Sequence, residues 1–289
     1  MCGRGNTAEI FGLDGREKMS KFIIQGGKEL AGEVRISGSK NAALPIIAAT
    51  VLVKGKITLY NVPNIQDVQT MFEIIRDIGG KVTKKNNKMI IDTSKINTYE
   101  IPENLMRKMR SSVILAGAII GKYNKANFSY PGGCEIGSRP IDLHLKGFEK
   151  LGINIKEEYG EIICNAEKIE GTQIHLDFPS VGATENIILA ACLAEGTTIL
   201  TNAAKEPEIE DMVKFLNKAG AKIRGAGTDR VEIIGVKKLF EISYNIMPDR
   251  IEAGTYLVAG AITGGNVKII NANPNHIEPI LDKLEEANC

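Results

Sequence analysis

Residues 131–140, with the sequence PGGCEIGSRP, place a thiol and a guanidinium in one glycine-rich turn. Gly132 and Gly133 carry no side chain, so a ligand can approach their backbone closely. Cys134 can act as a nucleophile or as a proton donor. Arg139 presents a planar fork that suits a phosphate or a carboxylate. A structural thiol is normally set in an apolar run, so this turn predicts reactive chemistry on an anionic substrate.

Further basic residues stand at the leading ends of predicted helices. Lys40, Arg110 and Arg250 each precede an apolar helix, whereas Val181 occupies the matching place before a fourth. Because helix N-termini carry unpaired N–H groups and partial positive charge, an added Lys or Arg makes an anion site. The alternative is that these residues only keep the helix ends soluble. Their recurrence beside small-residue turns favours anion binding.

His144 allows two interpretations. It could orient a substrate or buffer a proton, since its ordinary pKa lies near neutrality. However, it occupies a position on the apolar face of a predicted helix, where a histidine is more often a hydrogen-bonded core residue. The pair Asp249 and Arg250 is equally open, as a structural ion pair or as part of a hinge between domains.

Glu206 and Glu208 resemble paired catalytic carboxylates. The intervening Pro207 favours a different role, because proline is preferred at the first position of a helix. We therefore predict that a helix begins there, with Glu208, Glu210 and Asp211 complementing its dipole.

The elements that must position these residues form a unit used four times, with a period of about 70 residues. In each unit an apolar helix leads into a strand, a turn, a second amphipathic helix, a helix-capping residue and a β-hairpin. The first helices are predicted at residues 42–52, 112–120, 185–194 and 253–262. The capping residues are Gly79, Gly152, Gly220 and Asn288. Hairpins are predicted over residues 81–92, 154–165 and 222–235, but the chain ends where the fourth should begin.

Composition excludes several classes of protein. The formal net charge is +1, which argues against bulk attraction to nucleic acid or to an anionic membrane. No apolar run is long enough to span a bilayer. The five cysteines are scattered without a CxxC pair, which predicts a reduced, cytosolic protein and no zinc site. Cys164 and Cys192 lie in apolar runs and are predicted core residues.

Two nucleotide-binding motifs are absent. The sequence Gly38-Ser39-Lys40 is not a Walker A loop, because a serine separates the glycine from the lysine and the earlier glycine is missing. No GxGxxG motif opens a helix. An NTPase or a dinucleotide-dependent enzyme is therefore not indicated, and no cofactor is expected.

Five motifs in order resemble those of the UDP-N-acetylglucosamine 1-carboxyvinyltransferases. They are SGSKNAALP at residues 37–45, MRSS at 109–112, PGGC through RPIDLH at 131–144, SVGAT at 180–184 and PDRIE at 248–252. The resemblance runs from about Met19 to Cys289. It implies an α/β fold of the enolpyruvyl transferase type, in which repeated units build inside-out α/β barrels.

The resemblance also implies a division into domains. Residues 40–247 would form one complete three-repeat domain, while residues 19–39 and 248–289 would form part of a second. Residues 1–18 show no clear periodicity, and we expect them to be a non-native or disordered extension. The family places its active site between the two domains.

The reaction implied is transfer of the enolpyruvyl group from phosphoenolpyruvate to UDP-N-acetylglucosamine with release of phosphate, a step of peptidoglycan synthesis. The resemblance implies that Lys40 and Asn41 contact phosphoenolpyruvate and that Cys134 is the proton donor. Arg139 holds the phosphate. The sugar nucleotide is expected to contact Arg110, Arg139, Pro140, Ile141, Asp142, Leu143, Phe178, Pro179, Ser180 and Val181, and Arg250 completes the predicted substrate-binding set.

The family's aspartate base and further arginines lie in the last third of its chain, at positions that have no counterpart here. We therefore expect this chain to show weak turnover or none. Two alternatives remain open: a fragment that binds the nucleotide sugar without turnover, and the related shikimate-pathway enolpyruvyl transferase, whose leading motif resembles Gly-Ser-Lys-Ser.

Overall fold

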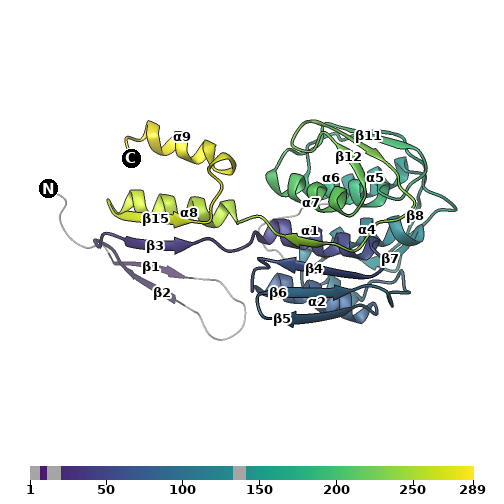
Figure 1. Ribbon diagram of the computed structural model, residues 1–289, viewed down its shortest axis with the longest axis horizontal. Coiled ribbons are helices and arrows are strands. Elements are labelled where there is room, and N and C mark those ends of the chain that lie inside the picture. Colours follow the sequence, from purple (N-terminus) through teal and green to yellow (C-terminus); the bar gives the residue numbers. More distant parts are fainter. Residues whose placement is uncertain (1–6, 12–20, 133–140) are drawn as a thin grey trace. The chain divides into compact units, whose positions relative to one another are not determined.

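The computed structural model describes residues 7–11, 21–132 and 141–289. It divides the chain into two compact units (Figure 1). Unit 1 comprises Met1–Ile36 and Arg250–Cys289, and unit 2 comprises Ser37–Asp249. Each unit has its own hydrophobic cluster.

Unit 2 contains the predicted helix–strand–helix–hairpin unit three times. The first copy consists of α1 (Lys40–Ala49) with the short helix η1 (Thr50–Leu52), β4 (Lys56–Tyr60), α2 (Gln66–Asp77), β5 (Lys81–Lys85) and β6 (Lys88–Asp92). The second consists of η2 (Arg110–Val113), α4 (Ile114–Tyr123), β7 (Lys125–Ser129), α5 (Asp142–Lys150), β8 (Asn154–Glu158) and β9 (Glu161–Asn165). The third consists of α6 (Val181–Ala191), β11 (Thr197–Thr201), α7 (Pro207–Lys218), β12 (Lys222–Arg224) and β13 (Arg230–Ile234).

The connections between copies close unit 2 into a ring. After the first copy, which is followed by α3 (Glu103–Met106), Glu100 bridges in parallel to Asn127 of β7. After the second copy, β10 (Gln173–His175) pairs in parallel with β11 of the third. After the third, β14 (Ser243–Asn245) pairs in parallel with β4 of the first. Each copy thus adds an edge to the sheet of the next, and the last returns to the first.

The predicted capping residues end the second helices as the sequence indicates. Gly79, Gly152 and Gly220 have φ values of 102°, 83° and 105°, and Asn288 has 58°. This left-handed conformation ends a helix and is accessible mainly to glycine and asparagine. The equivalent placement of all four residues supports the fourfold repeat.

The core of unit 2 is built from its apolar first helices. The side chains of residues 42–49 in α1, 114–121 in α4 and 183–191 in α6 are buried almost all round. Figure 1 shows α1 and α4 lying between the sheet of β4, β5 and β6 and the helices of the third copy. Helices inside and sheets outside are the predicted inside-out arrangement. Cys164 and Cys192 are core residues, as predicted, and are 2% and 1% exposed.

Unit 1 contains the fourth copy. The elements of unit 1 are β1 (Thr7–Phe11), β2 (Lys21–Gln25), β3 (Ala31–Arg35), α8 (Arg250–Ile262), β15 (Asn266–Ile270), η3 (Pro274–His276) and α9 (Glu278–Glu286). Of these, α8, β15 and α9 correspond to the first helix, the strand and the second helix of the repeat. β15 pairs in parallel with β3, and β1 pairs antiparallel with β2. Strand β1 lies inside the segment for which the sequence predicts no regular element, because a five-residue pairing partner is available in β2.

Few side chains are buried in residues 25–36 and 250–289 of unit 1. Its hydrophobic cluster consists of Ile36, Ala253 and Ile277 with partly buried neighbours. Ile262 is 82% exposed and Val258 45%. Among the described residues no helix is long and apolar enough to cross a membrane.

Candidate functional site

The start of α1 is tightly constrained. The Ser39 hydroxyl accepts a hydrogen bond from the Ala42 amide at 3.3 Å. The Lys40 amide donates to the carboxylate of Asp249 at 3.2 Å. A Cβ atom at Gly38 would lie 1.7 Å from the carbonyl oxygen of Asn61, so only glycine fits there. These contacts set the direction in which α1 begins and hence the position of Lys40.

Lys40 itself is available to a ligand. Its Nζ lies 3.3 Å from Asp67 Oδ2, in an ion pair whose side chains are 45% and 38% exposed. An exposed ion pair of this kind is weak, so an incoming phosphate can replace the carboxylate at small cost. The neighbouring Asn41 is exposed. The sequence allows Asp249 to be part of an ion pair or of a hinge. In the structure its carboxylate accepts a hydrogen bond from the first amide of α1, and it is the last residue of unit 2.

The second cation, Arg110, begins η2 immediately before α4. Its positive charge acts on His144, whose pKa is lowered to about 4 by burial first and by Arg110 second, against an opposing effect of Asp142. Arg110 of η2 and the first turn of α5 therefore share one neighbourhood. The imidazole of His144 is neutral at physiological pH.

His144 is hydrogen-bonded in the core, as the more conservative interpretation predicts. Its Nδ1 lies 2.7 Å from Nδ2 of Asn186 on α6. The same amide nitrogen donates to the Val113 carbonyl at 3.0 Å, and Asn186 Oδ1 accepts from the Gly117 amide at 2.8 Å. Asn186 thus joins α5 and α6 to the first turn of α4.

The sugar-nucleotide residues predicted on α5 and α6 are brought close together. Ile141 and Leu143 flank the exposed Asp142 at the start of α5, and Val181 begins α6 after the N-cap Ser180. The two helix starts meet at Gly182, where an added Cβ atom would lie 3.0 Å from His144 Cε1. Phe178, which precedes this start, is 66% exposed.

Three predicted residues, Cys134, Arg139 and Pro140, lie outside the described residues. Arg250 is the first residue of α8 in unit 1, as expected from its place in the repeat. The helix starts in unit 2 at Lys40, Arg110 and Val181 match the positions that the repeat predicts.

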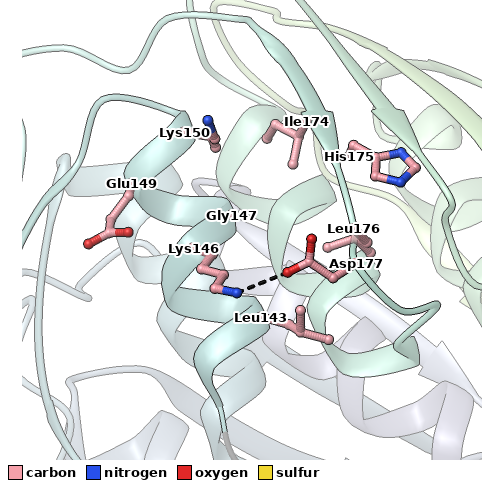
Figure 2. Close-up of a pocket in the computed structure, with 9 residues that line it drawn as sticks. All are labelled: Leu143, Lys146, Gly147, Glu149, Lys150, Ile174, His175, Leu176 and Asp177. Carbon is pink, nitrogen blue, oxygen red and sulfur yellow. Dashed lines mark hydrogen bonds and ion pairs between the residues drawn. The ribbon is translucent and has the colours of Figure 1, made fainter.

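A surface groove of about 430 Å³ lies between α5 and β10 (Figure 2). Leu143 is among the residues that line it. Lys146 and Asp177 point toward one another across it and form an ion pair of 2.9 Å. Sequence reasoning missed both residues, although Lys146 lies one turn after Leu143 and Asp177 immediately precedes Phe178. Their pairing links the two segments that are predicted to line the sugar nucleotide.

The start of α7 has the predicted proline, and two of its carboxylates are buried. Pro207 is the first residue of the helix, as predicted. The side chains of Glu208 and Asp211 are 2% and 6% exposed. Asp211 accepts hydrogen bonds from the Tyr244 hydroxyl at 2.7 Å and from the Met247 amide at 3.1 Å. The helical turn directs them inward, which the dipole argument alone could not indicate.

Asn186 and Glu185 are two buried polar residues that sequence reasoning missed. Both lie in a helix classified as apolar, and their polarity within that run was the available signal. Burial raises the pKa of Glu185 well above its usual range, and the nearby charges of Glu208 and Glu206 raise it further. Among the described residues no group of three or more histidine, cysteine or acidic side chains could hold a metal ion.

Solved structures with the same fold are enolpyruvyl transferases. The enolpyruvyl transferase NikO from Streptomyces tendae matches with a TM-score of 0.79 at 24% identity, over 90% of this chain and 63% of its own. The EPSP synthase from Acinetobacter baumannii matches with a TM-score of 0.68 at 20% identity, over 91% of this chain and 60% of its own. At these identities the likeness establishes the fold.

The family model described as EPSP synthase (3-phosphoshikimate 1-carboxyvinyltransferase) matches residues 24–289, and the chain belongs to this family of carboxyvinyl transferases. Its curated relatives include the UDP-N-acetylglucosamine 1-carboxyvinyltransferase 2 of Caldanaerobacter subterraneus subsp. tengcongensis, 54% identical over 94% of this chain. The UDP-N-acetylglucosamine 1-carboxyvinyltransferase of Geobacter metallireducens is 47% identical over 93% of it. The matches cover 65% and 64% of these relatives, so the chain spans less than two thirds of their length.

Proposed function

We propose that this chain carries the phosphoenolpyruvate and sugar-nucleotide residues of a UDP-N-acetylglucosamine 1-carboxyvinyltransferase. The observation that carries the proposal is the agreement between its motifs and relatives of that name at 47% to 54% identity. The placement of Arg110, Ile141–Leu143 and Ser180–Val181 around one pair of helix starts supports it. The overall reaction converts phosphoenolpyruvate and UDP-N-acetylglucosamine into enolpyruvyl-UDP-N-acetylglucosamine and phosphate.

The chemistry divides among the named groups. Lys40 and Arg139 bind the phosphate of phosphoenolpyruvate, beside the exposed Asn41 at the start of α1. Cys134 gives a proton to the methylene carbon, which leaves oxocarbenium character at the adjacent carbon. The sugar 3-hydroxyl attacks that carbon and loses its own proton. Loss of phosphate and of the proton from the methyl carbon then restores the double bond, and the cations stabilise the departing charge.

The weak ion pair between Lys40 and Asp67 suits this role. Without substrate, Lys40 is held near the helix start by the exposed carboxylate of Asp67. A bound phosphate trianion offers a stronger partner at the same end of α1. We therefore expect Lys40 to exchange Asp67 for the substrate phosphate. Asp67→Asn is then expected to retain or improve phosphoenolpyruvate binding, while Lys40→Ala abolishes it.

The test has a turnover arm and a binding arm. Phosphate release is measured with phosphoenolpyruvate and UDP-N-acetylglucosamine, using Cys134→Ala as the control, and UDP-N-acetylglucosamine binding is measured by calorimetry. Binding that is weakened by Arg110→Ala, with or without release that depends on Cys134, supports the proposal. Absence of both binding and release refutes it. Turnover of shikimate 3-phosphate in place of the nucleotide sugar would assign the chain to the other branch of the family.

A further inference from the structure

The buried carboxylate of Asp211 holds two groups from a distant part of the chain. Asp211 lies in the second turn of α7, and its side chain is 6% exposed. Its Oδ1 accepts a hydrogen bond from the Tyr244 hydroxyl at 2.7 Å, and its Oδ2 accepts one from the Met247 amide at 3.1 Å. A buried carboxylate is costly unless donors surround it, so its position and that of the two donors are fixed together.

Tyr244 is itself held as a donor. Its ring packs edge-on against that of Phe215, one turn after Asp211 on α7, with ring centroids 5.6 Å apart. Burial first, and the charge of Asp211 second, raise the pKa of Tyr244, so its hydroxyl keeps its proton. The hydroxyl also donates to the backbone carbonyl of Asp211 at 3.0 Å. The end of β14 is therefore anchored to α7.

The two residues after β14 are also held by the first copy of the repeat. The side-chain amide of Asn61, which follows β4, donates to the Ile246 carbonyl at 2.9 Å. The next residue, Met247, donates to Asp211 of the third copy. The backbone at residues 246 and 247 is thus bound on successive residues by the first and the third copies, which leaves it little freedom to shift.

This segment sets the start of α1. The Met247 carbonyl accepts from the Ser39 amide at 2.8 Å, and Gly38 forms an antiparallel bridge with Pro248. Ser39 is the N-cap of α1, and Lys40 is its first residue. The contacts therefore run from the carboxylate of Asp211 through Met247 to the N-cap of the helix that begins with Lys40.

We propose that Asp211 is a positioning residue for the phosphoenolpyruvate site, because by holding Met247 it fixes the N-cap of α1 and hence the place of Lys40. The contact between Lys40 and the substrate phosphate rests on the proposed function above. Asp211 acts through Met247 and Ser39. A misplacement of about 1 Å at a binding group can cost up to about a hundredfold in rate, so a small shift of this helix start matters.

Two substitutions separate the geometry of Asp211 from its charge. Asp211→Leu removes the carboxylate that accepts both hydrogen bonds. In Asp211→Asn, the side-chain oxygen can still accept from the Met247 amide, and the side-chain nitrogen can donate to the Tyr244 hydroxyl, which is also an acceptor. The second variant therefore keeps the position of residue 247 without the negative charge.

Thr93→Val is the matched control for a general loss of stability. Thr93 is fully buried in unit 2, and its hydroxyl donates to the Val53 carbonyl and accepts from the Gly55 amide at 3.3 Å. The substitution removes buried hydrogen bonds of the turn between η1 and β4, at the opposite end of α1 from Lys40.

Calorimetry with phosphoenolpyruvate and with UDP, combined with thermal unfolding, gives the expected pattern. Asp211→Leu should bind phosphoenolpyruvate about tenfold more weakly, while its affinity for UDP, whose predicted contacts lie on α5 and α6, should change by less than about threefold. Asp211→Asn should bind both ligands within about threefold of wild type. Thr93→Val should unfold at a lower temperature and alter neither affinity.

Wild-type affinity for phosphoenolpyruvate in a folded Asp211→Leu variant would overturn the proposal, as would an equal loss for phosphoenolpyruvate and UDP. A loss in Asp211→Asn as large as in Asp211→Leu would also overturn it, because charge and not position would then be required. If Asp211→Leu does not fold, Tyr244→Phe decides, since it removes one donor that holds the carboxylate. It should weaken phosphoenolpyruvate binding about threefold and leave UDP binding unchanged, and an unchanged affinity for phosphoenolpyruvate would refute the positioning role.

If the wild-type chain binds no phosphoenolpyruvate, the proposed function fails, and hydrogen exchange then tests the positioning role by itself. In Asp211→Leu, or in Tyr244→Phe if the former does not fold, the amides of Ser39 and Lys40 should exchange faster than in wild type. The Leu176 amide, which is hydrogen-bonded to the third copy, should keep its rate. Faster exchange at Ser39 and Lys40 alone supports the inference, whereas unchanged or uniformly faster exchange refutes it.

Discussion

The substitution Asn186→Leu tests whether the buried amide organises the helix starts of unit 2. Leucine has nearly the same shape as asparagine, so the change removes hydrogen bonds without leaving a large cavity. Three groups lose a partner: the Gly117 amide, the Val113 carbonyl and His144 Nδ1. Asn186 is fully buried, so water cannot replace it. At about 1 kcal/mol for each net hydrogen bond, we expect a loss of about 3 kcal/mol in the free energy of unfolding.

Urea unfolding followed by circular dichroism measures the loss, because the chain contains no tryptophan for fluorescence. The control is Asn104→Leu, at an exposed position of α3, which should change stability by no more than about 0.5 kcal/mol. Hydrogen exchange of the Gly117 amide gives a local readout, since this amide should exchange faster in Asn186→Leu alone. A loss below about 1 kcal/mol, with unchanged protection of Gly117, would refute the reasoning.

Three further predictions concern pH and packing. The pKa of His144 falls from about 6.5 to about 4 on folding, so between these values the unfolded chain binds a proton that the folded chain does not. Stability should therefore decrease by about 2 kcal/mol from about pH 8 to about pH 5, and His144→Gln should lack this decrease in urea titrations. For Glu185 the pH dependence of stability has the opposite sign. Because its pKa is raised in the folded chain, stability is lost as the pH rises above 4.5, the pKa of the unfolded chain. Glu185→Gln should therefore resist urea better than wild type at pH 8 and equally well at pH 4. Gly38→Ala places a Cβ atom 1.7 Å from a backbone oxygen and should lower the free energy of unfolding, measured by heating, by more than about 2 kcal/mol. In Gly160→Ala the Cβ atom meets no atom within 4 Å, so the positive φ alone should lower it by about 1 kcal/mol. Equal losses in the two variants would contradict the steric argument.

The repeated elements could be predicted because their signals are local. Apolar residues at helical spacing, a capping glycine and a polar hairpin tip each depend on a few neighbouring residues. The structure confirms these elements in every copy of unit 2, although the first helices begin up to four residues before their apolar runs. Those starts depend on N-cap residues such as Ser39 and Ser180, which stand outside the apolar pattern.

The interactions of the candidate site could be predicted only in part. The positions of Lys40, Arg110 and Val181 at helix starts follow from the repeat and are confirmed. The ion pairs of Lys40 with Asp67 and of Lys146 with Asp177 join segments far apart in the chain, and no local pattern indicates such pairs. The burial of Glu208 and Asp211 likewise depends on the neighbours of α7 and not on its dipole.

By itself, the sequence determined the fourfold repeat, the α/β class, the family and the residue types available for binding an anion, because these depend on periodicity and on side-chain chemistry. Only the tertiary structure decided which copies pair, through β14 returning to β4, and which side chain holds His144 in the core. That second outcome requires Asn186 and Gly117 to meet His144 across three helices. A hydrogen bond forms only at about 3 Å with the correct orientation, so it follows from packing in three dimensions and not from spacing along the chain.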